Sequence, residues 1–184
     1  MMFRHRTTPG PALLAPLAMR LATLVVAIAL TAALSARAET ALVEFDINSP
    51  SRLAQQHAGR PYIVALWSVY CEPCRHELKL LGEFSRKHPR VAVELVSTDF
   101  LDQRSVVLEA LAGYALDGIR RWSFASDFAD PIRYAIDPAW RGELPRSYLY
   151  DGCGGVRAIS GLLQPETLQA WLHNLELDGS KSCI

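Results

Sequence analysis

The spacing of hydrophobic positions after residue 38 changes from segment to segment, and each spacing predicts an element of secondary structure. Residues 61–67 form a near-continuous apolar run, which is typical of a strand buried on both faces. Residues 71–87 place Cys74 and Leu78 on one apolar face at helical spacing, so we expect a helix there. Residues 91–97 alternate and predict a second central strand.

The remaining segments predict shorter elements, and turn or capping residues mark their ends. They are an edge strand over 41–45, a helix capped by Ser49 or Ser51 that runs to about His57, a helix over 104–114, a strand over 122–125, one or two helical turns over 131–135, a hairpin of 146–150 and 156–160, and a helix over 165–175. This order predicts an α/β sandwich with a mixed sheet. No repeat or Gly/Ser linker interrupts residues 39–184, so we expect one domain there.

Charge separates the chain into two parts. The whole sequence of 184 residues balances 19 Lys and Arg against 19 Asp and Glu. Residues 1–38 contain four arginines and no acid, so residues 39–184 carry 15 basic and 19 acidic side chains, a net charge of −4. Because no basic stripe remains there to neutralise phosphates, no nucleic-acid partner is expected.

Residues 1–38 have the three-part layout of an export signal. Basic residues near the start precede an apolar run over 21–34, and the small residues Ala36 and Ala38 follow it. We therefore expect cleavage after Ala38 and a mature domain in the periplasm. The alternative is an uncleaved membrane anchor, but the run has 14 residues, whereas a bilayer core requires roughly 20.

All four cysteines lie in the mature part, where an oxidising compartment permits disulfides. Two of them form the run Cys71-Glu72-Pro73-Cys74, between the buried strand and the start of a helix. Backbone N–H groups and the helix dipole stabilise a thiolate there, which favours a redox role with Cys71 exposed and Cys74 as the resolving thiol. The alternatives are an inert local disulfide, half of a zinc site and a chance match, although a zinc site would need a second ligand pair. We expect no bound metal.

The stretch 67–74, Trp-Ser-Val-Tyr-Cys-Glu-Pro-Cys, resembles the active-site signature of thioredoxin-fold proteins. Among them it is similar to the exported TlpA/ResA/DsbE group of thiol-disulfide oxidoreductases. The resemblance implies a thioredoxin-like fold, in which helices flank a mixed central sheet and an insertion precedes a cis-proline loop. Glu143, Leu144 and Pro145 stand where this family places that loop. A cis Pro145 is therefore implied, with Leu144 offering backbone hydrogen bonds to a peptide, whereas an ordinary trans proline is the alternative.

Glu77 is the candidate acid–base residue. It follows Cys74 by three positions on the same helical face, where similar proteins of the ResA type carry a glutamate that assists proton transfer. A half-buried carboxylate near a buried thiol would have a raised pKa and could accept the Cys74 proton. The alternative is a solvated residue that pairs with Arg75 or Lys79. Ala65 stands where thioredoxins proper carry a buried Asp, which leaves Glu77 as the local base.

Further residues around the cysteines are candidates for contact with a substrate. The full set is Trp67, Tyr70, Glu72, Pro73, Leu144, Pro145 and Arg146. The acid at Glu72 opposes thiolate formation on Cys71 and so favours a reductant. Arg146 stands where relatives usually have Thr, and a guanidinium aimed at Cys71 would stabilise the thiolate. The alternative for Arg146 is a solvent-facing strand residue, and Trp140 is expected either in the core or as a wall of the groove near Pro145.

Cys153 and Cys183 form the second cysteine pair. Cys153 lies in the predicted hairpin turn, and Cys183 is the penultimate residue. A last strand of roughly 17 Å and a returning helix of roughly 16 Å bring the tail back near the turn, at the pole opposite Cys71. We therefore expect a structural disulfide, and two free thiols are the alternative.

These observations predict an exported thiol-disulfide oxidoreductase of the protein-disulfide reductase type that works without a cofactor. By family analogy its partners are exported proteins with disulfides, such as apocytochrome c or copper-site proteins, and a membrane thiol reductant of the DsbD kind. We expect a monomer. One alternative is a Cu(I) carrier that uses Cys71, Cys74 and His76, although His76 is two positions after Cys74 and so points away from it. The other is a disulfide oxidase or isomerase.

Overall fold

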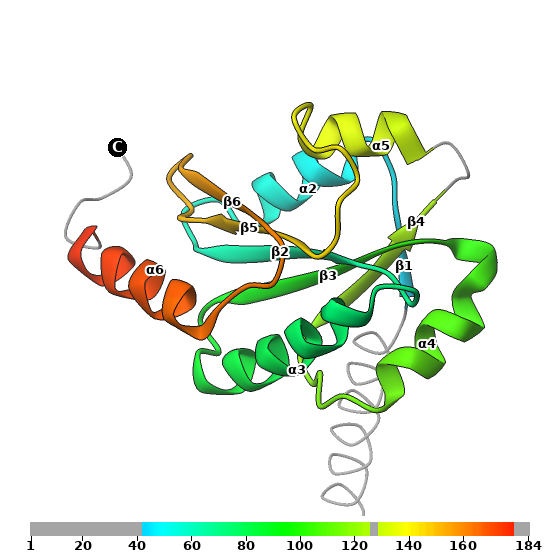
Figure 1. Cartoon of the computed structure of the whole chain (residues 1–184). Coiled ribbons are helices and arrows are strands. Elements are labelled where there is room, and N and C mark those ends of the chain that lie inside the picture. The colour runs from blue at the N-terminus through cyan, green and yellow to red at the C-terminus, as the bar shows by residue number, and fades with distance from the viewer. Residues whose placement is uncertain (1–41, 126–128, 179–184) are drawn as a thin grey trace, which may run out of the picture. The chain divides into compact units, whose positions relative to one another are not determined.

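The computed structural model describes residues 42–125 and 129–178, all within the unit formed by residues 39–184 (Figure 1). Residues 1–38 lie outside the described part, so the export signal and its cleavage stay predictions. The elements are β1 (Leu42–Phe45), α2 (Ser49–Gln56), β2 (Tyr62–Trp67), α3 (Glu72–Lys87), β3 (Ala92–Phe100), the 3-10 helix η1 (Leu101–Gln103), α4 (Arg104–Ala112), β4 (Arg120–Phe124), α5 (Ala129–Ile136), β5 (Arg146–Tyr150), β6 (Val156–Ser160) and α6 (Pro165–Asp178). Within these described ranges, no helix is long and apolar enough to cross a membrane.

The strands form one six-stranded mixed sheet in the order β1-β4-β3-β2-β5-β6. The strands β1, β4, β3 and β2 run parallel to one another, whereas β5 pairs antiparallel with both β2 and β6. Every residue of β2 is buried, as its continuous apolar run predicts. The predicted α/β arrangement with a mixed sheet and a terminal hairpin is therefore confirmed.

Helices cover both faces of the sheet, and each face has its own hydrophobic core (Figure 1). Along β2, Ile63 and Ala65 belong to the core that α3, α4 and α6 cover. Val64 and Leu66 belong to the core that α2 and α5 cover. Because the side chains of a strand alternate between its faces, two consecutive residues of β2 or β5 reach different cores.

The ends of several elements differ from the prediction. Neither Ser49 nor Ser51 caps α2, because Asn48 is its N-cap residue. The hydroxyl of Ser49 instead accepts a hydrogen bond from the N–H of Asp46 at 2.9 Å and donates one to Oδ1 of Asp46 at 3.0 Å. The strand β3 ends at Phe100 rather than at residue 97, because a shift in register lets it continue along β4.

The unit formed by η1, α4 and β4 widens the sheet on one side. It follows β3 in sequence, and β4 lies between β1 and β3. The pairing of β2 with β5 is left intact, and Leu66 lies opposite Arg146 in that pair. The carboxyl end of β2, which leads to the cysteines, therefore lies beside the amino end of β5, which follows Pro145.

Candidate redox site

A disulfide joins Cys71 to Cys74 at the amino end of α3, with the Sγ atoms 2.00 Å apart and the Cα atoms 5.3 Å apart. Cys71 is the N-cap residue of the helix and has an extended backbone. Cys74 is completely buried, whereas Cys71 is partly exposed. The predicted positions of the two cysteines are thus confirmed, and a partner thiol or disulfide would reach the Cys71 sulfur first.

Asp99 of β3 holds the loop that precedes Cys71 by hydrogen bonds. The Oδ1 atom of Asp99 accepts a hydrogen bond from the Ser68 hydroxyl at 2.7 Å, and Oδ2 accepts one from the Val69 N–H at 2.9 Å. The hydroxyl of Ser97 also donates to Oδ2, at 2.6 Å. Asp99 is buried, and it was missed by the sequence analysis. The signal that could have found it is an acid near the end of a strand that is otherwise buried.

Glu77 is buried, and only 3% of its surface is exposed. Its carboxylate accepts hydrogen bonds from the Ser147 hydroxyl at 2.5 Å and from the Leu163 N–H at 2.9 Å. Burial raises the pKa of Glu77 above its ordinary value, while the two hydrogen bonds oppose that rise. The alternative of a solvated Glu77 paired with Arg75 or Lys79 is therefore wrong. Ser147, which the sequence analysis did not single out, lies opposite Ala65 in the β2–β5 ladder.

The loop before β5 contains a cis peptide bond between Leu144 and Pro145. The Pro145 carbonyl accepts a hydrogen bond from the Gly161 N–H at 2.9 Å, which ties the loop to the end of β6. Leu144 is partly buried and packs against both cores. Within the described part of the chain, the backbone N–H and C=O of Leu144 have no hydrogen-bond partner. These groups are thus available beside the strand end that leads to Cys71.

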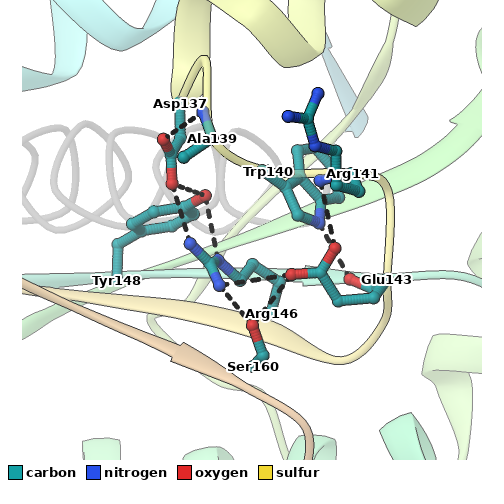
Figure 2. Close-up of polar contacts among 8 residues, drawn as sticks. All are labelled: Asp137, Ala139, Trp140, Arg141, Glu143, Arg146, Tyr148 and Ser160. Atoms are coloured by element: carbon teal, nitrogen blue, oxygen red, sulfur yellow. Dashed lines mark hydrogen bonds and ion pairs between the residues drawn. The ribbon is translucent and has the colours of Figure 1, made fainter.

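Arg146 occupies neither of the two positions predicted for it from the sequence. Its side chain neither points at Cys71 nor faces solvent, because its guanidinium binds Asp137 and Glu143 in a network that Figure 2 shows. Ser147 reaches Glu77 on the α3 side of the sheet, so the alternation along β5 turns Arg146 to the other side. Although burial tends to raise the pKa values of Asp137 and Glu143, the hydrogen bonds to each carboxylate hold both below their ordinary range. The guanidinium is therefore absent from the surface that a substrate would touch.

The other predicted contact residues differ in exposure. Tyr70 is 79% exposed, and Glu72 and Pro73 are exposed as well. Trp67 is buried beneath the loop, and its indole N–H has no acceptor among the residues that the structure describes. Trp140 is also buried, and its indole donates to the Glu143 carbonyl at 2.9 Å. Trp140 belongs to the core that α2 and α5 cover. It was predicted either in the core or as a wall of the groove near Pro145, and the core is observed.

Two further predictions concern His76 and the second cysteine pair. His76 is exposed on α3. Among residues 42–125 and 129–178, no group of three or more His, Cys, Asp and Glu side chains is placed to hold a metal ion. Cys153 lies in the exposed turn between β5 and β6. Cys183 lies outside the described residues, so the Cys153–Cys183 bridge stays a prediction.

The sheet order, the disulfide at the start of a helix and the neighbouring proline loop define a thioredoxin-like protein. No protein-family model matches the sequence. The thiol-disulfide oxidoreductase ResA of Bacillus cereus is 26% identical over 120 residues, which are 64% of this chain and 64% of that protein. The chain thus spans less than two thirds of the length of this relative.

Solved structures show the same fold. DsbF of Mycobacterium tuberculosis superposes with a TM-score of 0.53 at 21% identity and covers 66% of this chain and 84% of its own. A thiol:disulfide interchange protein from Chlorobium tepidum superposes with a TM-score of 0.53 at 18% identity and covers 66% of this chain and 83% of its own. The chain therefore has the thioredoxin-like fold, and over 120 residues its sequence is similar to that of the thiol-disulfide oxidoreductase ResA.

Proposed function

We propose that this protein is an exported thiol-disulfide oxidoreductase that reduces disulfides of exported proteins with its Cys71/Cys74 pair. One observation carries the proposal: the two sulfurs are unequally buried, and a buried acid stands one helical turn beyond the inner one. Cys71 is partly exposed, and both Cys74 and Glu77 are buried. Burial of a carboxyl group is unfavourable, and a disulfide with a purely structural role does not require such a group nearby. The buried acid therefore favours a redox role for the pair.

The reaction passes two electrons from the dithiol to the substrate. The Cys71 thiolate attacks one sulfur of the substrate disulfide, so a mixed disulfide forms and the other substrate sulfur leaves as a thiolate. Glu77 accepts the proton of Cys74, and the Cys74 thiolate attacks the Cys71 sulfur. The mixed disulfide breaks, the second substrate thiolate leaves, and the Cys71–Cys74 disulfide remains. Burial raises the pKa of Glu77, which makes its carboxylate a stronger base for this proton.

The substrate binds as an extended segment beside Cys71. The unpaired backbone groups of Leu144 supply hydrogen bonds of the kind that a neighbouring strand would make. Pro73 and the exposed ring of Tyr70 provide the apolar contacts around that segment, whereas Trp67 and Pro145 are buried and support the site from within. The carboxylate of Glu72 is exposed and pairs with Arg75 at 3.4 Å, and its negative charge next to Cys71 is the feature that favours transfer of electrons to the substrate.

The proposed partners follow from the chemistry and from the family resemblance. Each turnover leaves the protein oxidised, so a thiol donor must return two electrons, and we assign this role to a membrane thiol reductant of the DsbD kind. The substrates are disulfides of apocytochrome c or of copper-site proteins. We also propose cleavage of the export signal after Ala38, which N-terminal sequencing of the protein from a periplasmic fraction tests. A mature chain that still begins at Met1 would contradict the cleavage.

The activity is tested with the reduced protein and a short synthetic peptide closed by one internal disulfide. We expect the wild type to open one peptide disulfide per Cys71/Cys74 dithiol, and Cys71→Ser to open none. Cys74→Ser should stop at a mixed disulfide with the peptide, which mass spectrometry detects. A fully reduced wild type that leaves the peptide oxidised would contradict the proposal. A reduction potential near that of a strong oxidant, about −120 mV, would contradict the reductive direction alone.

A further inference from the structure

The guanidinium group of Arg146 joins its own strand β5 to three other parts of the chain (Figure 2). Its Nη2 atom donates to Oδ2 of Asp137, just after α5, at 2.7 Å. Its Nη1 atom donates to Oε1 of Glu143 in the loop before β5 at 3.2 Å, and to the Ser160 hydroxyl on β6. Its Nε atom donates to the Tyr148 hydroxyl at 3.1 Å. One side chain thus reaches the end of a helix, a loop and two strands.

The two carboxylates of this network also hold the backbone of the loop. Oδ1 of Asp137 accepts a hydrogen bond from the Ala139 N–H at 2.8 Å. Oε2 of Glu143 accepts one from the Arg141 N–H at 3.1 Å. The indole of Trp140 donates to the Glu143 carbonyl. The irregular segment 137–145 is therefore fixed through these two acids, and both acids are fixed by Arg146.

We propose that Arg146 is a positioning residue that holds Leu144 in the conformation in which its backbone binds the substrate peptide. This inference rests on the proposed function. Leu144 lies between Glu143, which Arg146 binds, and Pro145, whose carbonyl is bound by Gly161. The Arg146 side chain is only 11% exposed and Asp137 is 20% exposed, so the charge-assisted hydrogen bond between them is weakly screened by salt, whereas Glu143 is 42% exposed. A loop that is already ordered loses less conformational entropy when a peptide binds.

The kinetic test compares Arg146→Ala and Arg146→Lys with the wild type, with the disulfide-closed peptide as substrate and dithiothreitol as reductant. We expect Arg146→Ala to raise KM for the peptide by about tenfold with little change in kcat. The KM of Arg146→Lys should lie between those of the wild type and Arg146→Ala, because Lys keeps the positive charge but lacks the planar guanidinium group. The rate at which dithiothreitol alone reduces the Cys71–Cys74 disulfide should stay unchanged, because Arg146 contacts neither sulfur. Arg52→Ala on α2 is the matched control, because it removes an exposed ion pair to Asp46, which precedes that helix.

Hydrogen exchange of the loop gives a readout that does not depend on activity. We expect the hydrogen-bonded amides of Ala139, Trp140 and Arg141 to exchange faster in Arg146→Ala than in the wild type, and Arg52→Ala to leave them unchanged. Unchanged loop exchange, an unchanged KM, or an equal slowing of the peptide and dithiothreitol reactions would each overturn the positioning role. If the wild type itself fails to reduce the peptide, the proposed function is contradicted, and loop exchange still decides whether Arg146 orders Leu144.

Discussion

The carboxylate of Glu77 on α3 accepts a 2.5 Å hydrogen bond from the hydroxyl of Ser147 on β5, 70 residues further along the chain. Ser147 directly follows Arg146, and the two side chains lie on opposite sides of the sheet. One of them supports the acid beside the buried cysteine, and the other supports the loop that carries Leu144. The first residues of β5 therefore connect the two halves of the candidate site.

Replacement of Glu77 by Gln should slow the step in which Cys74 resolves the mixed disulfide. The variant keeps the shape of the side chain but cannot accept a proton, and loss of a general base lowers rates by roughly 100-fold or more. Rapid-mixing measurements of peptide thiol release, taken across a pH series, check this. Glu83→Gln on the same helix should behave as the wild type. An unchanged rate and pH profile in Glu77→Gln would remove Glu77 from the mechanism.

Glu77→Gln should also change how the free energy of unfolding depends on pH. The pKa of Glu77 is raised above 4.5 in the folded protein, so the unfolded chain releases this proton first as the pH rises. The contribution of Glu77 to the free energy of unfolding is therefore greatest below the unfolded pKa, and it declines as the pH rises toward the folded pKa. Urea unfolding across this range should show a decline in the wild type that is smaller in Glu77→Gln. Parallel curves for the two proteins would mean that the pKa of Glu77 is not raised.

Ser147→Ala should destabilise the protein through the acid that Ser147 binds. The variant leaves the buried Glu77 carboxylate with one hydrogen-bond donor, from Leu163. Hydrogen bonds to charged groups contribute about 1.5–3 kcal/mol, so we expect a loss of that order in urea unfolding at neutral pH. Protonation of Glu77 at low pH should reduce the difference. Ser105→Ala, on the exposed side of α4, is the control, and an equal loss there would argue against a specific role for Ser147.

Asp99→Ala should loosen the loop before Cys71. The variant removes the acceptor of the part-buried Ser68 hydroxyl and Val69 N–H and of the buried Ser97 hydroxyl, and a buried donor left unpaired costs about 1–3 kcal/mol. We expect lower stability in urea and faster hydrogen exchange at Val69. Asp102→Ala on η1, an exposed residue, provides the comparison. Protection of the Val69 amide that survives in Asp99→Ala would show that other contacts hold the loop.

The predicted Cys153–Cys183 bridge is open to a direct measurement. Peptide mapping of the oxidised protein by mass spectrometry should find these two cysteines joined, apart from the Cys71–Cys74 disulfide. Loss of the bridge in Cys153→Ser should lower the free energy of unfolding by about 3–4 kcal/mol in the chain-entropy model. Two alkylated thiols at Cys153 and Cys183 in the oxidised protein would contradict the bridge.

Local patterns determined much of the fold from the sequence. The continuous apolar run of β2, the helical spacing of α3 and the glycine-rich turn between β5 and β6 predicted elements close to those observed. The placement of Cys71 at the amino end of a helix and of Cys74 on its buried face followed from the same spacing. These features depend on residues within a few positions of each other, so a single sequence is enough to predict them.

The tertiary structure decided which distant residues meet. The insertion of β4 between β1 and β3, the support of the Cys71 loop by Asp99 and the bond from Ser147 to Glu77 all join residues that are far apart in the chain. Arg146 was placed wrongly from the sequence, because its direction depends on the register of β5 against β2 and its partners come from the end of α5 and from β6. The sequence by itself therefore determined where the cysteine chemistry lies, and the packing of the sheet decided which acid, hydroxyl and guanidinium surround it. The physical reason is that secondary structure follows from local spacing, whereas hydrogen-bond partners follow from strand order and register.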